Sequence, residues 1–322
     1  MDYREIGRTG IKVSEISLGC WTLGGRTWNE GESTGWDDVN EDEAINAVNY
    51  AVDRGVNHFD NADVYGNGRA ERLLAKALGK RSKEVVIATK VGHFKGTAEH
   101  AYEPQHIIHQ CEQSLVNLKR EYIDIYYFHH GDFGEQDRYL HDAVDAMSRL
   151  KKQGKIRAIG FSAYSQDDFL RLTDEINPDV LQSWANIFDT RFIEENSKVA
   201  KMMKERNITF VAFSPLAKGL LLGKYSSKNL PKFPDGDHRR DDERFKKEFL
   251  EELEPKIEKL KERFGRLTRD LSRVALQYVL SHDLVSCVIP GFRNRDQVEA
   301  NLWGRDKKLT KEDIAYIKEI FR

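Results

Sequence analysis

Four side chains that could move a proton follow three consecutive apolar runs of the chain. Asp60 and Tyr65 come after one run, Lys90 ends the next, and His129 follows the third. A free tyrosine has a pKa of about 10, but an adjacent ammonium favours its phenolate and lowers that value. We therefore expect Lys90 to tune Tyr65 and Asp60 to keep Lys90 protonated. With His129 donating a hydrogen bond to a carbonyl oxygen, the set suits carbonyl reduction.

These side chains meet only if the runs before them are neighbouring parallel strands. Eight β-rich runs alternate with segments of helical periodicity, and most are continuously apolar, which is typical of a parallel sheet covered by helices. The runs are Ile16–Gly19, Val56–Phe59, Val85–Thr89, Ile123–Phe128, Ile156–Phe161, Val180–Ser183, Ile208–Phe213 and Ser286–Ile289. Eight such units predict an α/β fold, the (β/α)8 TIM barrel, in which the carboxyl ends of all strands face one mouth.

Helix start signals support this alternation. Asn40, Ser165, Asn294 and Thr310 each stand three residues before an acid or amide, as N-cap residues do, and Pro104 fits the first turn of another helix. The cap at Thr310 begins an extra helix at the C-terminal end.

Two further segments complete the predicted single domain, residues 1–322. An N-terminal hairpin turning at Arg8–Gly10 is expected to cap the bottom of the barrel. Between the seventh and eighth strands lies a polar loop, Ser226–Arg244, where a lid would sit. Two helices follow it, the first with Pro255 in its first turn and the second over Leu271–Leu280.

Composition narrows the class of protein. Of 322 residues 39% are hydrophobic, enough for a sizeable core, and the formal net charge of -2 gives no field that would recruit nucleic acid or an anionic membrane. Cys20, Cys111 and Cys287 are widely separated, which argues against disulfides and a zinc site. The polar N-terminus and the lack of a long apolar stretch predict a cytoplasmic protein.

The sequence resembles the aldo-keto reductase superfamily along nearly its whole length. The motifs that carry the resemblance are FDNADVYG (Phe59–Gly66), ATK (Ala88–Lys90), DIYYFH (Asp124–His129), IGFS (Ile159–Ser162), FSPL (Phe213–Leu216) and IPG (Ile289–Gly291). The resemblance implies that Asp60, Tyr65, Lys90 and His129 form the catalytic set. It also implies NADPH or NADP+ as the cofactor, extended across the barrel mouth, a small carbonyl compound as the substrate, and a monomer.

The same resemblance implies a set of cofactor-binding residues. They are Gly19, Cys20, Trp21, Asp60, Ser162, Gln182, Phe213, Ser214, Leu216, Lys218, Gly219, Gly291, Arg293, Gln297 and Asn301. Ser162 and Gln182 would hold the nicotinamide carboxamide, and Phe213 stands where the family usually has a tyrosine stacked on the nicotinamide ring. Arg293, with Arg295 beside it at a helix N-terminus, suggests a 2′-phosphate and hence NADP.

Substrate contacts are expected from Trp21, Tyr65 and His129. Two positions depart from the family pattern. Ala163 replaces a common asparagine, which either removes a carboxamide hydrogen bond or shifts it to Gln182 or Asn186, and Ala300 replaces a common glutamate. The loops His130–Leu140 and Leu216–Phe249 would decide the substrate.

Two other functions compete with the reductase. A redox-sensing auxiliary subunit, as in the potassium-channel β subunits of this family, would bind NADPH without relying on turnover. A metal-dependent hydrolase could use His129, His130 and Asp132, although no other predicted strand end offers a histidine. The glycines at 66 and 68 are interpreted as a turn that feeds a helix rather than as a dinucleotide loop.

Overall fold

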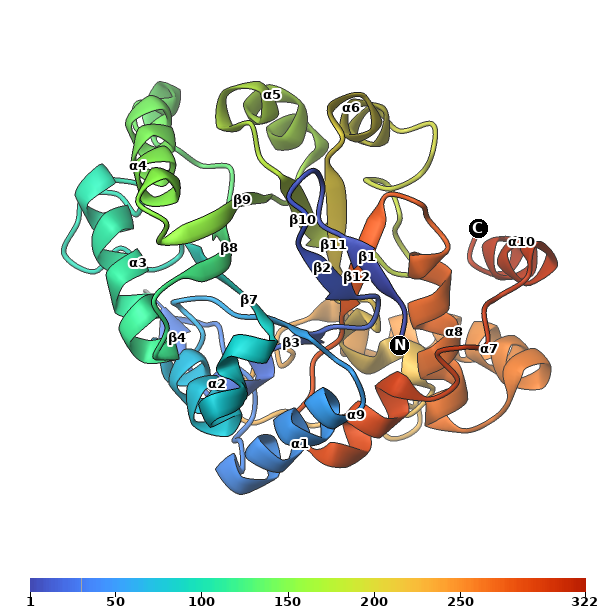
Figure 1. The fold of residues 1–322 in the computed structure, drawn as a ribbon. Helices are drawn as coiled ribbons and strands as arrows, with labels where there is room; N and C mark the ends of the chain where they lie inside the picture. Colours follow the sequence, from blue (N-terminus) through green and yellow to red (C-terminus); the bar gives the residue numbers. More distant parts are fainter. Residues whose placement is uncertain (30) are drawn as a thin grey trace.

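Eight parallel strands form the centre of the molecule in the computed structural model, which describes residues 1–29 and 31–322 (Figure 1). In chain order they are β3 (Leu18–Gly19), β6 (His58–Asp60), β7 (Val86–Val91), β8 (Ile123–Phe128), β9 (Ile156–Ser162), β10 (Val180–Trp184), β11 (Thr209–Phe213) and β12 (Val285–Ile289). Each pairs with the next along the chain. Parallel bridges from Ile16 to Val288 and from Gly19 to Gly291 bring the first and last strands together, so the barrel is nearly closed. The predicted (β/α)8 barrel is confirmed.

Helices surround the barrel, and most of them bury apolar side chains in one cluster with the strands (Figure 1). They are α1 (Glu41–Asp53), α2 (Arg69–Leu78), α3 (Pro104–Leu118), α4 (Leu140–Lys152), α5 (Gln166–Ile176), α6 (Lys198–Arg206), α7 (Lys247–Phe264), α8 (Thr268–Leu280), α9 (Arg295–Leu302) and α10 (Lys311–Ile320). The side chains of Asn40, Ser165, Asn294 and Thr310 cap α1, α5, α9 and α10 as predicted. No helix within the described residues is long and apolar enough to cross a membrane.

The N-terminal hairpin closes one end of the barrel. Strands β1 (Tyr3–Glu5) and β2 (Lys12–Ser14) pair antiparallel and lie across the barrel axis (Figure 1). Ile6, Ile11 and Val13 are buried in one cluster with inward side chains of the barrel strands. Burial of this apolar face fixes the hairpin as the bottom cap that the sequence predicts.

The β11–β12 insertion, residues 214–284, departs from a simple barrel repeat. It holds two 3₁₀ segments, η4 (Ala217–Leu222) and η5 (Glu243–Phe245), followed by α7 and α8. Pro255 lies inside α7 rather than in its first turn, so that prediction is wrong. A proline inside a helix costs about 3 kcal/mol, whereas each fully buried aliphatic side chain returns about 1.5–3 kcal/mol. The buried residues Leu250, Leu253, Ile257 and Leu260 therefore carry the helix through Pro255.

The lid, residues 226–244 of the insertion, packs on a second hairpin that sequence reasoning did not predict. This hairpin consists of β4 (Trp28–Asn29) and β5 (Glu32–Ser33) and follows the first barrel strand. A bridge joins Gly35 to Asp237, and the backbone N–H of His238 donates to the Gly35 carbonyl at 3.1 Å. Two loops that are far apart in sequence therefore cover one side of the mouth together.

Candidate active site

The ends of β6, β7 and β8 bring the four predicted catalytic side chains together. The ammonium of Lys90 donates to a carboxylate oxygen of Asp60, to the backbone carbonyl of Asn61 at 2.6 Å, and to the Tyr65 hydroxyl at 3.3 Å. The Lys90 and Asp60 side chains are only 1% and 2% exposed. The His129 ring stands edge-on to that of Tyr65, with centroids 5.9 Å apart. A buried ion pair thus holds a cation directly behind the phenol.

The direction of the pKa shift of Tyr65 differs from the sequence-based prediction that Lys90 lowers this pKa. Burial, and after it the negative charges of Asp60 and neighbouring groups, raises the pKa of Tyr65 well above its ordinary value of about 10. Lys90 does not reverse this, because its charge is directed first at Asp60 and the Asn61 carbonyl. Tyr65 is therefore protonated at neutral pH, the form that a proton donor requires.

His129 is held as a neutral imidazole. Burial, with further contributions from His93, Lys90 and His130, lowers its pKa well below 6.5. His93 follows the end of β7 by two residues, and its ring lies 4.4 Å from that of His129, so the view that only one strand end offers a histidine is wrong. Even so, no group of three or more His, Cys, Asp or Glu side chains that could hold a metal ion occurs within residues 1–29 and 31–322.

A cavity of about 610 Å³ opens above these residues at the barrel mouth. Most of the predicted cofactor and substrate residues line it: Gly19, Trp21, Asp60, Tyr65, His129, Gln182, Phe213, Ser214, Leu216, Lys218, Gly219, Gly291, Arg293, Gln297 and Asn301. Three predicted residues do not. Lys90 lies beneath Tyr65, Ser162 is 1% exposed at the end of β9, and Cys20 is buried in the core. Arg295 stacks on the Tyr50 ring and points away from the cavity.

Unpaired cations mark the part of the cavity beyond Phe213. Lys218 pairs with Asp242, but neither Lys224 nor Arg293 forms an ion pair with any described residue. Sequence reasoning missed Lys224, which follows Gly223 at the end of η4, and Arg239 of the lid, which also lines the cavity. Two positive charges facing an open cavity suit the phosphates of a dinucleotide.

Ser162, Gln182 and Asn186 are the side chains expected to bind a nicotinamide carboxamide. The Ser162 hydroxyl is buried without a partner among the described residues, beneath the surface that lines the cavity. Gln182 already donates its amide to Asp60 at 2.8 Å, and the Asn186 amide donates to the Ser214 carbonyl at 3.2 Å. Each amide nitrogen carries two N–H groups, so both side chains keep one donor after these bonds are formed.

Aromatic rings form the wall on the substrate side. Trp21 stacks on His238 of the lid at 4.3 Å between centroids and lies over Tyr65 at 6.1 Å. On the opposite wall, His93 and the Tyr164 hydroxyl form a hydrogen bond of 3.1 Å. The predicted place of Trp21 at the mouth agrees with the structure, whereas the contribution of His238 has no signal in the sequence beyond its position in the long loop.

Comparisons with known proteins agree with this geometry. The profile of the Aldo/keto reductase family matches residues 15–322. An aldo-keto reductase of Bacillus subtilis (strain 168) is 31% identical over 93% of this chain and 87% of its own length. A probable voltage-gated potassium channel subunit beta of Oryza sativa subsp. japonica is 29% identical over 99% of this chain and 96% of its own. The holo form of an aldo-keto reductase from Bacillus halodurans superposes with a TM-score of 0.78 at 27% identity, covering 100% of this chain and 97% of that one.

Proposed function

The chain belongs to the aldo/keto reductase family, and on that premise we propose that it reduces aldehydes or ketones to alcohols, reversibly, with NADPH. Family membership supports an oxidoreductase activity, and members typically use NAD(P)H. One observation carries the finer proposal: Lys90 contacts both Asp60 and Tyr65 at the floor of a cavity whose far end holds the unpaired cations Lys224 and Arg293.

In this proposal the chain's own residues handle the proton and the substrate oxygen. Tyr65, which is protonated at neutral pH, donates its proton to the carbonyl oxygen. The Lys90 ammonium, 3.3 Å away, stabilises the phenolate that remains, and Asp60 keeps Lys90 charged. Neutral His129 orients the carbonyl by a hydrogen bond. NADPH, when bound, would supply the hydride for the carbonyl carbon.

The cofactor would be held by side chains from several strand ends. Ser162 would hydrogen-bond the carboxamide, Phe213 would stack on the nicotinamide ring, and Lys224 would face the pyrophosphate. Arg293 precedes the N-terminus of α9, where unpaired N–H groups and the helix dipole favour anions. These features support a preference for NADP over NAD through a 2′-phosphate. Gln297 and Asn301 would contact the adenine end.

A redox-sensing subunit is the second candidate, because a probable potassium channel subunit beta is among the similar proteins. Both functions require NADPH binding, so binding does not separate them. Turnover does, since a sensor need not reduce carbonyl compounds at a useful rate.

The test follows NADPH absorbance with a panel of small, aromatic and sugar aldehydes, comparing the wild-type protein with Tyr65→Phe. We expect turnover with part of the panel, and a loss of about a hundred-fold or more in the variant while NADPH still binds. NADPH binding without turnover on any carbonyl would favour the sensor, and unchanged turnover in Tyr65→Phe would rule out the role of Tyr65.

A further inference from the structure

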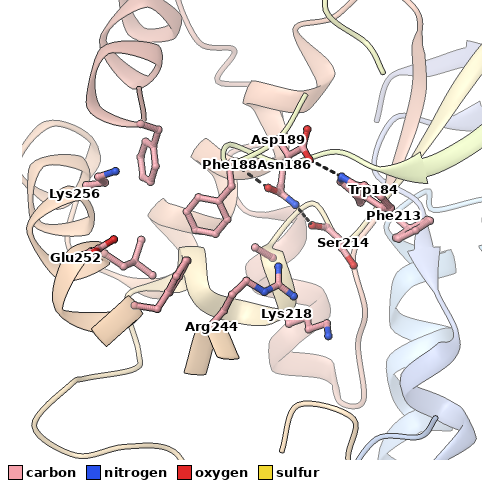
Figure 2. A pocket seen from close by; sticks show the side chains of 14 residues that line it. Trp184, Asn186, Phe188, Asp189, Phe213, Ser214, Lys218, Arg244, Glu252 and Lys256 are labelled. Atoms are coloured by element: carbon pink, nitrogen blue, oxygen red, sulfur yellow. Dashed lines mark hydrogen bonds between the residues drawn. The ribbon is translucent and has the colours of Figure 1, made fainter. Parts of the chain in front are cut away.

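A second cavity, of about 540 Å³, lies on the other side of the segment that follows β11 (Figure 2). Its walls come from that segment, from the loop after β10, from α7 and from the C-terminal Phe321. The volume is in the range of pockets that hold small molecules, about 300–1,000 Å³. Nothing in the proposed reaction uses this space.

Aromatic rings dominate the inner surface of the second cavity. Phe188 (Figure 2) lines it, together with Phe249, Phe321 and Leu253. Phe188 lies edge-on to Phe249 at 6.1 Å and tilted against Phe321 at 5.6 Å. Such rings favour a flat or branched apolar body.

The charges around the second cavity are mostly compensated. Lys218 and Arg244 share the carboxylate of Asp242. Asp189 pairs with Arg191 and accepts a hydrogen bond from the Trp184 indole. Two other charged side chains lie at the rim of the second cavity.

Those two side chains, Lys256 and Glu252, lie one turn apart on α7 (Figure 2). Within the described part of the chain neither forms an ion pair with a side chain of opposite charge. The Lys256 ammonium instead lies 5.7 Å from the Phe321 ring centroid, at the edge of the apolar surface. A cation beside an apolar pocket recognises an anion that carries an apolar group.

We propose that this second cavity binds a small organic monoanion, an aryl or branched-alkyl carboxylate. Its apolar body lies among Phe188, Phe249 and Phe321, and its carboxylate faces Lys256. Glu252 opposes the anion and limits its affinity.

The bound anion would also act on the cofactor cavity, an effect that rests on the proposed function. Phe213, Ser214 and Lys218 line both cavities. Ser214 and Lys218, with Ala217 between them, have φ angles of 51°, 56° and 48°, respectively, a conformation that side-chain-bearing residues rarely adopt. From the side of the second cavity, Asn186 holds the Ser214 carbonyl. A ligand that stabilises this strained segment changes the affinity for NADPH, and by linkage NADPH changes the affinity for the anion by the same factor.

Direct binding is tested without NADPH, by ligand-observed NMR titration of 3-phenylpropionate and of its neutral amide. We expect the carboxylate to bind about two- to five-fold more tightly than the amide, the range of a partly exposed ion pair. Lys256→Gln should abolish the difference and Glu252→Gln should increase it. Lys259→Gln, a change of the same kind on the exposed face of α7, should leave it unchanged.

Leu253→Trp, which fills the second cavity, should remove binding of both probes. If this variant does not fold, the three charge variants decide the question. Equal binding of amide and carboxylate, no saturation up to about 10 mM, or binding unchanged in Lys256→Gln would overturn the proposal. The last result would show that Lys256 does not contact the probe.

Coupling is tested by the NADPH affinity with and without saturating 3-phenylpropionate, with the Leu253→Trp variant as control. We expect a change of a few-fold in the wild type and none in the variant. An unchanged affinity in the wild type would overturn the coupling. A chain that binds the anion but no NADPH would instead contradict the proposed function, so the two failures are distinguishable.

Discussion

The two ends of the large cavity are built in different ways. Of the proposed catalytic residues, Asp60 and Lys90 lie on barrel strands, His129 directly follows one and Tyr65 lies in the loop after β6; none of the four has a positive φ. The cofactor end depends on the β11–β12 insertion, where three non-glycine residues adopt left-handed φ angles within five positions. Neighbouring strands fix the first group, whereas local contacts hold the second.

The ion pairs at the two ends of the cavity also differ in how far they are exposed to water. The Lys90–Asp60 pair is 1% and 2% exposed, while the Lys218–Asp242 pair is 19% and 12% exposed. Buried charges that are already in position suit catalysis, because they need no reorganisation during the reaction. Charges that water reaches suit a cofactor that must enter and leave.

The largest expected effect is a loss of protein stability when the buried Lys90–Asp60 pair is broken. Lys90→Met leaves the buried Asp60 carboxylate without its cation, and breaking such a pair typically costs about 3–5 kcal/mol. We expect the free energy of unfolding, measured by urea denaturation, to fall by that amount. The control Lys76→Met breaks the exposed pair with Glu41 and should cost less than about 1 kcal/mol. Similar losses in both variants would contradict the larger cost expected for breaking the buried pair.

We expect a barrel histidine and a lid histidine to contribute differently to the loss of stability at low pH. Burial lowers the pKa of both His58 and His238 to about 4, below the value of about 6.5 in the unfolded chain. The unfolded state then binds more protons, so stability is complete above pH 6.5 and falls as the pH drops to 4.

The His58→Leu variant should lose about 3 kcal/mol of this pH dependence, because His58 is fully buried in β6. His238→Leu should change this pH dependence far less, because local opening of the lid would hydrate the His238 ring. Urea denaturation between pH 4 and 7 measures both slopes, and an equal change would show a lid as rigid as the barrel.

Removing a cation at the adenosine end should alter affinity and not stability. For Arg293→Leu we expect the Kd for NADPH to rise about ten-fold, since a charge-assisted hydrogen bond contributes about 1.5–3 kcal/mol, and the Kd for NADH to stay the same. Fluorescence titration measures both constants. Arg295→Leu is the matched control, because Arg295 stacks on Tyr50. A parallel loss for NADPH and NADH would contradict recognition of a 2′-phosphate.

The smallest effect concerns the lid. His238→Ala removes a ring stacked on Trp21, and such contacts contribute about 0.5–1.5 kcal/mol. We expect KM for the carbonyl substrate to rise about two- to ten-fold with kcat unchanged, measured by steady-state kinetics. A fall in kcat at constant KM would show that the lid positions the catalytic set as well.

The same division explains what the sequence could predict. Apolar runs followed by Asp60, Lys90 and His129 are local patterns, and barrel topology then brings them together wherever they lie in the chain. The caps at Asn40 and Asn294 are equally local. These predictions are confirmed because the strand and helix periods alone determine them.

Features that depend on tertiary packing could not be predicted from the sequence. Pro255 predicts a helix start locally, but the buried face of α7 outweighs that signal. The pKa of Tyr65 depends on burial and on the other partners of Lys90, which no spacing reveals. The contribution of Lys224 and Arg239 to the cavity likewise follows from the folded path of the insertion.

The measurement that tests the account most directly is single-turnover oxidation of bound NADPH by a carbonyl substrate, with Tyr65→Phe and Lys224→Met side by side. We predict that Tyr65→Phe slows the chemical step by about a hundred-fold or more at unchanged Kd. Lys224→Met should raise the Kd about ten-fold and leave the rate at saturation unchanged. A Tyr65→Phe protein that oxidises NADPH at the wild-type rate would contradict the proposed chemistry.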